Sequence, residues 1–196
     1  MAQHRILILA SSSNYRRELL QRLRLEFECA APQVDEVAQA GEAPAATAVR
    51  LAELKARAVA SRFDDALIIG SDQVASCNGL RLGKPGNRAN AMRQLEFLSG
   101  KVADFDTAVC VLDTASGTLR ARLVPCRVAF RPLSRSQIEA YLDLEQPYDC
   151  AGSAKSEGLG ITLLASIRTD DPTALVGLPL IALTELLCDA GLPVPG

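Results

Sequence analysis

Two continuous apolar runs place the strongest constraint on how this chain can fold. Residues Ile6–Ala10 and Ala66–Ser71 carry no charged side chain. A strand without polar alternation is buried on both faces, so helices have to cover both sides of the sheet that contains it. The chain supplies such helices: leucines recur at helical spacing within Tyr15–Leu25, and an alanine-rich stretch runs from Pro44 to about Phe63. The pattern predicts a mixed α/β fold.

Turn and capping signals locate further elements. Asn78-Gly79 predicts a tight hairpin turn, Asn87 is a helix-capping residue, and Ser134 with Gln137 three residues later is a capping-box sequence. The other expected elements are strands at 27–31, 74–77, 80–82, 102–112, 119–130 and 161–167, helices at 87–100, 134–145 and 180–188, and a loop at 150–160. We expect one domain over residues 1–196, with a change of character near Lys101 that suggests lobes of about 1–100 and 101–196.

The charge balance and the cysteine pattern exclude several classes of function. The chain has 21 Lys and Arg against 23 Asp and Glu, a net charge of −2, whereas a general nucleic-acid-binding protein carries an excess of basic charge. No apolar run is long enough for a signal peptide or a membrane span. The six cysteines include no CxxC pair and there is one histidine, so the ligand spacing of a zinc site is absent. We therefore expect a cytoplasmic protein that binds neither nucleic acid nor a membrane.

The segment from Ser11 to Arg17 predicts a hydroxyl-rich turn and a helix N-terminus after a buried strand. Free backbone N–H groups at such a terminus favour anions. Arg16 and Arg17 in the first helical turn oppose the helix dipole, at a cost of about 0.3 kcal/mol or more each. A phosphate bound between the arginines and the helix end would resolve this conflict. An ordinary serine cap with solvated arginines explains the segment equally well.

Asp72 follows the second apolar run directly. A carboxylate at the end of such a strand can hold a hard divalent cation or accept a proton from an attacking water. The alternative is a turn residue that caps the following hairpin. Asp35-Glu36 offers further carboxylates, with a solvated loop as its simpler explanation. Because His4 is the single histidine, base catalysis would have to use a carboxylate or a metal-bound water.

Lysine is rare, with four lysines against seventeen arginines. Where arginine is the usual base, a retained lysine can mark a site that needs a compact ammonium against a phosphate. Lys84, between Gly83 and Pro85, and Lys155, among small residues, lie in settings that allow a ligand to approach closely. Lys101 is also explained as a charge at a helix C-terminus, and chance alone could produce the pattern.

These segments together resemble the Maf family of nucleotide pyrophosphatases, which remove non-canonical nucleoside triphosphates. The resemblance runs in family order from Leu9 to about Leu183. The matching stretches are Leu9-Ala10-Ser11-Ser12-Ser13 with Arg16, Val34-Asp35-Glu36, Lys55, Gly70-Ser71-Asp72-Gln73, Gly83-Lys84-Pro85, Ser99-Gly100-Lys101 and Cys150-Ala151-Gly152-Ser153 through Gly158. Asn14 departs from the usual proline of the family, but asparagine is also a competent cap.

Three positions resemble the branch of the family that acts on 7-methyl-GTP. The branch acting on dTTP and UTP has arginine at the position of Tyr15, threonine at Gln73 and glutamine at Glu157. A cationic methylated guanine would stack on an aromatic ring and favour a nearby carboxylate. The resemblance therefore implies that Tyr15, Gln73 and Glu157 select the base.

The resemblance also implies a mechanism and a fold. Water would attack the α-phosphorus of 7-methyl-GTP and release 7-methyl-GMP and pyrophosphate. The implied roles are Asp72 as proton acceptor near Mg²⁺ or Mn²⁺, Glu36 as a residue that orients water or metal, and Ser11, Arg16, Lys55 and Lys84 as phosphate-binding residues. The implied fold, of Maf/ITPase-like type, is an elongated mixed β-sheet flanked by helices, with two lobes, a central cleft and a homodimer as a common assembly.

Two alternatives remain open on the sequence. The first is the same chemistry on dTTP, UTP or modified pyrimidine nucleotides. The second is a non-catalytic nucleotide-binding regulator, against which Asp72, Lys55 and Lys84 argue, because binding alone does not require a carboxylate beside the phosphates.

Overall fold

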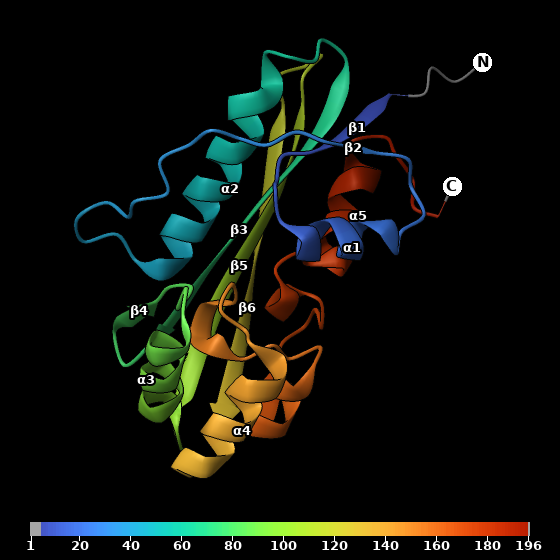
Figure 1. Cartoon of the computed structure of the whole chain (residues 1–196). Coiled ribbons are helices and arrows are strands. Elements are labelled where there is room, and N and C mark those ends of the chain that lie inside the picture. Colours follow the sequence, from blue (N-terminus) through green and yellow to red (C-terminus); the bar gives the residue numbers. More distant parts are fainter. Residues whose placement is uncertain (1–4, 196) are drawn as a thin grey trace. The chain divides into compact units, whose positions relative to one another are not determined.

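The computed structural model describes residues 5–195, so His4 lies outside the described part of the chain. Helices and strands follow one another in an α/β order (Figure 1). The elements are β1 (Ile6–Leu9), α1 (Asn14–Gln21), β2 (Glu28–Cys29), α2 (Pro44–Ala60), β3 (Ala66–Cys77), β4 (Leu80–Leu82), α3 (Arg88–Leu98), β5 (Val102–Asp113), β6 (Leu119–Phe130), α4 (Arg135–Glu145), η1 (Ala151–Ser153), η2 (Leu159–Leu163), β7 (Leu164–Arg168), η3 (Ala174–Val176) and α5 (Leu180–Asp189). This order confirms the predicted mixed α/β fold.

The strands described between residues 5 and 195 form one mixed sheet. Its order is β2-β1-β3-β5-β6-β7, and β4 pairs with β3. β1 runs parallel to β2 and β3, with Leu9 opposite Cys29 on one side and Ile69 on the other. The β3–β4 and β6–β7 pairs are antiparallel. The mixture follows from the connections, because the parallel neighbours β1 and β3 are linked through helices and β3 and β4 through a hairpin.

The chain divides into two compact units. Unit 1 comprises the residues up to Gln73, residues 107–124 and the residues from Asp171 onwards; unit 2 comprises residues 74–106 and 125–170. Each unit therefore takes segments from both halves of the chain, which differs from the expected lobes of about 1–100 and 101–196. The physical reason is that β3, β5 and β6 each have twelve residues and contribute part of their length to each unit. The expected central cleft stays a prediction.

The strands of unit 1 carry helices on both faces. Leu67 and Ile69 of β3 belong to a buried cluster with α1 and α5. Gly70 faces the other way, because a Cβ placed on it would lie 3.0 Å from the Cβ of Ala56 in α2 and 3.0 Å from the Sγ of Cys110. Successive residues of a strand point to opposite faces. Hence α1 and α5 cover one face here and α2 covers the other, as the two apolar runs required.

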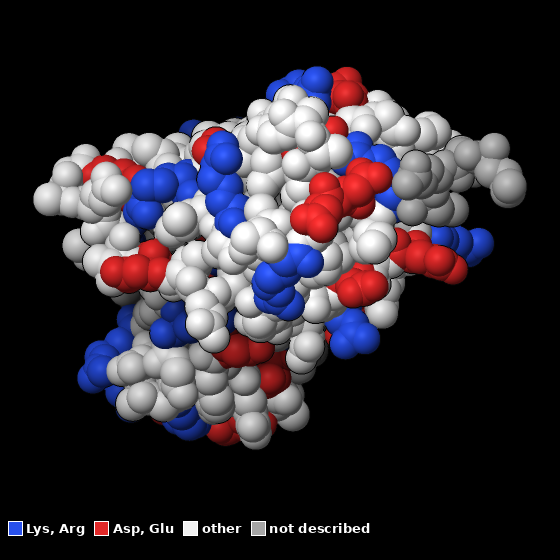
Figure 2. All heavy atoms as spheres, turned by 90° about the horizontal axis from the view of Figure 1, so that it is seen from above, with Lys and Arg blue, Asp and Glu red and all other residues white. Residues whose placement is uncertain are grey.

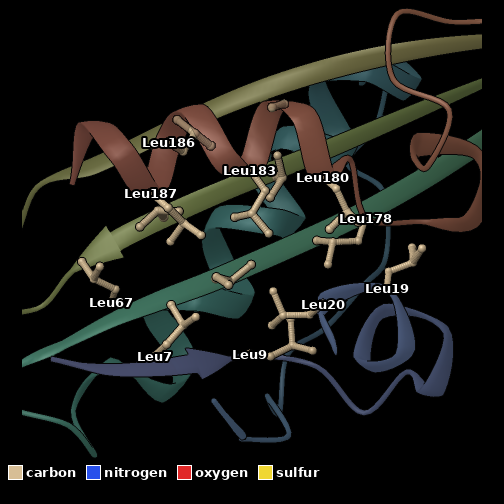
Figure 3. Close-up of a cluster of buried hydrophobic side chains, with 14 of the residues drawn as sticks. Leu7, Leu9, Leu19, Leu20, Leu67, Leu178, Leu180, Leu183, Leu186 and Leu187 are labelled. Carbon is tan, nitrogen blue, oxygen red and sulfur yellow. The ribbon is translucent and has the colours of Figure 1, made fainter. Parts of the chain in front are cut away.

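The cluster under α1 and α5 is made mostly of leucines (Figure 3). Leu183, Leu186 and Leu187 of α5 recur at helical spacing and are fully buried, and Leu19 and Leu20 of α1 meet them. Each such leucine contributes about 1.5–3 kcal/mol by leaving water. This burial, rather than helix propensity alone, explains why the short helix α1 is stable.

In unit 2, α3 contacts both α4 and η1, and α4 contacts η2. The predicted caps are confirmed: the side chain of Asn87 accepts a hydrogen bond from the N–H of Asn90, and Ser134 with Gln137 forms a complete capping box. Gly152, at φ +73°, lies against the ring of Phe105, since a Cβ there would be 3.1 Å from the ring. Position 152 therefore requires a glycine for two reasons: its positive φ and the lack of space for a Cβ.

β3 is longer than the sequence predicted. Separate strands were expected at Ala66–Ser71 and 74–77, with Asp72 in a turn or at the end of the first, but β3 is continuous from Ala66 to Cys77 and pairs with β4 through the Asn78-Gly79 turn. The predicted hairpin is confirmed, with positive φ at both turn residues. The prediction that Asp72 ends a strand is wrong. The pairing with β4 involves Ala75–Cys77, but β3 also has the twelve-residue strand β5 as a neighbour in the sheet, and it continues through Asp72. Similarly, α1 ends earlier than predicted, at Gln21.

The face drawn in Figure 2 has no large patch of a single charge. Figure 2 shows both acidic and basic residues spread over this face, in keeping with the net charge of −2. Among residues 5–195, no helix is both long enough and apolar enough to traverse a bilayer.

Asp171 ties the start of α5 to the segment before it. The carboxylate is 2% exposed. Its Oδ1 accepts hydrogen bonds from the backbone N–H and the hydroxyl of Thr173, at 3.0 and 2.7 Å, and its Oδ2 accepts from the N–H groups of Ile181 and Ala182, at 2.7 and 3.3 Å. The residue before α5, Pro179, provides no side-chain cap, so Asp171 satisfies the free N–H groups of this helix terminus from a distance.

Replacing Asp171 with alanine should destabilise the protein by about 3 kcal/mol, because buried donors lose their acceptor. Asp171→Asn retains one acceptor oxygen and should cost less. The free energy of unfolding in urea, followed by circular dichroism, measures both losses. Asp170→Ala is the matched control; that side chain is exposed, and its removal should change stability by about 0.5 kcal/mol or less. Equal losses for Asp170→Ala and Asp171→Ala would contradict the capping role.

Candidate active site

Alternation along β3 sends three neighbouring side chains to different surroundings. Ser71 points to the face where the segment before α5 lies, and its hydroxyl is hydrogen-bonded to the carbonyl oxygens of Ala108 at 2.8 Å and Gly177 at 3.0 Å. Gln73 shares that face. Asp72 points the other way, towards Lys55 of α2. Because the side chains of Ser71 and Gln73 are both hydrogen-bonded, the backbone of Asp72 is held on each side.

Lys55 joins two carboxylates. Its Nζ lies 2.6 Å from Oδ1 of Asp72 and 2.8 Å from Oε1 of Glu36. Lys55 is 5% exposed and Asp72 is 6% exposed, whereas the side chain of Glu36 is 61% exposed. Buried charges are stable only when paired; Asp72 has Lys55 as its partner, and Lys55 has both Asp72 and Glu36. Glu36 connects this buried pair to the surface.

Electrostatic coupling extends to Arg16. Burial raises the pKa of Asp72 above its ordinary value, although the positive charges of Lys55 and Arg16 act in the opposite direction. Burial also lowers the pKa of Arg16, with Asp72 and Glu36 opposing the shift; a guanidinium remains protonated nonetheless. A carboxylate with a raised pKa is a stronger proton acceptor, as general base catalysis requires. Two cations and two carboxylates of unit 1 thus form one electrostatic group.

The serine turn before α1 is a true helix cap. The N–H of Arg16 donates to the Oγ of Ser13 at 3.4 Å, and the N–H of Ser13 donates to the Oγ of Ser11 at 3.1 Å. The predicted alternative of solvated arginines holds for the exposed Arg17 but is wrong for Arg16, whose Nε donates to the carbonyl oxygen of Gly177 at 2.8 Å. That bond holds the guanidinium in place.

Gln73 has its amide nitrogen committed to the protein. Nε2 donates to the hydroxyl of Thr107 at 2.9 Å and to the carbonyl oxygens of Ala174 and Leu175 at 2.9 and 3.0 Å. Carbonyl oxygens only accept, so the amide cannot be reversed. Thr107 is fully buried and donates to Ala174 as well. Sequence reasoning missed Thr107 and the carbonyl of Gly177; a buried hydroxyl in an apolar strand was the available signal for Thr107.

The structure brings Arg16, Glu36, Lys55 and Asp72 together within unit 1, and Tyr15, half-buried, precedes Arg16 on α1. Lys84 and Glu157 are both exposed and belong to unit 2. The other two lysines of unit 2 have structural partners. Lys101 donates to the carbonyl oxygen of Phe97 at the end of α3, and Lys155 pairs with Glu145 at 3.3 Å. The helix C-terminal explanation of Lys101 is therefore confirmed.

The donor set suits only one mode of metal binding. Among residues 5–195, no group of three or more His, Cys, Asp or Glu side chains is arranged to hold a metal ion. Asp72 and Glu36 supply two carboxylates, which lie near one another because both pair with Lys55. Mg²⁺ is commonly held by one or two carboxylates together with substrate phosphates and waters. The residues present fit that mode and do not fit a protein-only metal cage.

Comparison with known proteins places these residues in a family. The family model described as "Maf-like protein" matches residues 6–190. A protein of Paraburkholderia xenovorans named 7-methyl-GTP pyrophosphatase is 58% identical over 97% of this chain and 94% of its own length. Proteins of the same name from Nitrosospira multiformis and Methylobacillus flagellatus are 57% and 56% identical; each alignment covers 96% of this chain, and 95% and 98% of the respective relatives.

Among solved structures, the Ham1 protein of Staphylococcus aureus aligns with 65% of this chain and 73% of its own, at 15% identity and a TM-score of 0.46. That score is too low to establish a common fold. The match over residues 6–190 and the high identity of nearly full-length relatives are decisive by themselves. The chain belongs to the Maf-like protein family.

Proposed function

We propose that this chain is a nucleoside triphosphate pyrophosphatase that hydrolyses 7-methyl-GTP to 7-methyl-GMP and pyrophosphate. The observation that carries the proposal is the buried Lys55–Asp72 pair, which leads through Glu36 to the surface. A structural ion pair gains little from burial by itself, so the arrangement is better explained by chemistry. The names of the relatives support the same substrate.

In the proposed reaction, Asp72 accepts a proton from the attacking water. The water oxygen forms a bond to the α-phosphorus, the bond from that phosphorus to the bridging oxygen breaks, and pyrophosphate leaves. Arg16 and Lys55, with Ser11, balance the charge that develops on the phosphates. Lys84 of unit 2 is the remaining proposed phosphate-binding cation. Glu36 orients the water or the metal.

A divalent cation is the cofactor that we propose, held by Asp72 and Glu36. When bound, Mg²⁺ or Mn²⁺ would neutralise phosphate charge and polarise the reacting group. Lys55 already neutralises much of the charge of the two carboxylates. It would thereby prevent the site from retaining a cation tightly in the absence of nucleotide.

Base selection is assigned to Tyr15, Gln73 and Glu157. The ring of Tyr15 would stack on the cationic base, with an effect of about 1 kcal/mol. The exposed Glu157 would attract the positive charge of the base, with an effect of about 0.5 kcal/mol. With its nitrogen committed elsewhere, Gln73 can offer a base only its Oε1 as an acceptor. An acceptor suits the N–H groups of a guanine edge. The homodimer and the cytoplasmic location expected from the sequence remain predictions.

The decisive experiment measures pyrophosphate release from 7-methyl-GTP, GTP, dTTP, UTP and CTP, each with Mg²⁺ and with EDTA. We expect 7-methyl-GTP to have the highest kcat/KM, about tenfold above GTP, since an additional cation–π contact contributes about 1–2 kcal/mol. EDTA should abolish release.

Each other outcome selects an alternative. A preference for dTTP or UTP would retain the reaction but overturn the assignment of Tyr15, Gln73 and Glu157. Tight binding of uncleaved nucleotide in the presence of Mg²⁺ would indicate a regulator and not an enzyme. Release that is unaffected by EDTA would overturn the metal proposal alone.

A further inference from the structure

The turn that carries Lys84 is held at three backbone positions. The carbonyl oxygen of Gly83 accepts a hydrogen bond from Nε2 of Gln94 at 2.9 Å, and that of Pro85 accepts one from Nδ2 of Asn90 at 2.8 Å. The N–H of Gly86 donates to the carbonyl oxygen of Tyr148 at 2.9 Å. The carbonyls immediately before and after Lys84 are therefore both fixed, in a segment with no regular structure of its own.

Helix α3 provides both amides from one face. Asn90 and Gln94 are four residues apart, so their side chains lie one above the other. Lys84 itself is exposed, and within residues 5–195 its ammonium forms no ion pair. A held backbone combined with an unpaired cation is a favourable arrangement for binding an anion, because the backbone is ordered before the ligand arrives.

Gln94 also reaches the loop that carries Glu157. Its Oε1 accepts a hydrogen bond from the hydroxyl of Ser153 at 2.7 Å. Ser153 is fully buried and has φ +58°, an uncommon conformation for a residue with a side chain. Since Gly83 offers an acceptor and Ser153 a hydroxyl, Gln94 uses its nitrogen towards one and its oxygen towards the other. A single amide thus connects the Lys84 turn with the loop.

We propose that Gln94 is a positioning residue for Lys84, and that it couples the Lys84 turn to the loop that carries Glu157. The inference rests on the proposed function, because it takes Lys84 as a phosphate-binding residue. Gln94 touches neither substrate nor reacting atoms in this scheme; it acts through the backbone of Gly83. The length and the two-sided hydrogen bonding of glutamine are both needed for this role.

The first test compares Gln94→Met with Glu96→Met. Methionine has nearly the same length as glutamine but makes no such hydrogen bonds, and Glu96 is an exposed residue of the same helix. Gln94→Met should lower kcat by about tenfold or more for both 7-methyl-GTP and GTP, because misplacing a charge-balancing group affects the transition state most. It also breaks the bond to Ser153, so it should shift the ratio of 7-methyl-GTP to GTP efficiency as well. Glu96→Met should stay within twofold of the wild type.

A double-mutant cycle separates positioning from general destabilisation. If Gln94 acts through Lys84, the Gln94→Met substitution should change kcat by less than twofold in a protein that already carries Lys84→Ala. A merely structural role would give the same loss in both backgrounds. Ser153→Ala removes only the connection to the loop, and it should alter the ratio of 7-methyl-GTP to GTP efficiency more than it alters kcat.

The two hydrogen bonds of Gln94, to Gly83 and to Ser153, form what we call the Gln94 clamp. Amide hydrogen exchange tests this clamp independently of catalysis. In Gln94→Met, the amide of Gly86 and the amides of residues 150–157 should exchange at least tenfold faster than in the wild type and in Glu96→Met. Absence of pyrophosphate release by the wild type would overturn the proposed function, and the exchange result would still decide whether the clamp exists. Unchanged exchange together with unchanged kcat in Gln94→Met would overturn the positioning role.

Discussion

Replacing Asp72 with asparagine is expected to lower kcat for pyrophosphate release by about 10²- to 10⁴-fold, the contribution typical of a general base. An amide has the shape of a carboxylate and can still accept a hydrogen bond from Lys55, which lies 2.6 Å away, but it cannot take a proton from water. The loss should be mainly in kcat, because nucleotide binding relies on other groups.

The same substitution should leave the fold intact. The Asp72 carboxylate is buried at a cost, as its raised pKa indicates, and Lys55 keeps Glu36 as a partner after the change. Circular dichroism and thermal unfolding check this. Asp64→Asn, the same replacement at an exposed residue just before β3, should leave kcat unchanged. If Asp72→Asn retains activity within tenfold of the wild type, Asp72 is not the proton acceptor.

Local chemistry made much of the fold predictable. The caps at Asn87 and Ser134 and the Asn78-Gly79 turn each depend on interactions within a few residues, so their residue types are sufficient evidence. The end of β3 was not predictable in this way. Whether the chain turns at Asp72 or continues depends on the pairing of β3 with β5, a strand distant in the sequence, and such a tertiary event overrides local preference.

The candidate site also has residues that could be predicted from the sequence and contacts that could not. Asp72 is noticeable in the sequence because a charged residue directly after an apolar run requires an explanation, and Lys55 through the rarity of lysine and the family resemblance. Their pairing at 2.6 Å is a consequence of how β3 packs on α2. The contribution of the Gly177 carbonyl, which receives Arg16 and Ser71, cannot be seen in a sequence, because every residue has a carbonyl group.

Replacing Gly70 with alanine is expected to destabilise the protein by about 3 kcal/mol or more, at the upper end for overpacking in a core. A Cβ at this position would overlap the backbone carbonyl oxygen of Ala52 in α2 and approach Ala56 and Cys110 to 3.0 Å each. Restricting the unfolded chain favours alanine by only about 0.4–1 kcal/mol, so the clash dominates. The free energy of unfolding in urea measures the loss.

The nature of the obstacle makes this prediction sharp. A side chain can move, but the Ala52 carbonyl cannot yield unless α2 shifts. Cys110→Ala removes one of the side-chain contacts and none of the backbone overlap, so it should not restore the stability of Gly70→Ala. Gly83→Ala is the matched control, because a Cβ there meets no heavy atom within 4 Å; its free energy of unfolding should match the wild type within about 0.5 kcal/mol.

Because α2 also carries Lys55, the cost of Gly70→Ala should reach the active site. A shift of α2 away from β3 would lengthen the distance between Lys55 and Asp72, which face each other across the same contact two residues further along the strand. The folded fraction of Gly70→Ala, measured below its unfolding transition, should therefore release pyrophosphate more slowly than the wild type. A stable Gly70→Ala protein with unchanged kcat would show that β3 and α2 are not in close contact at Gly70. It would also contradict the explanation that this packing places Lys55 beside Asp72.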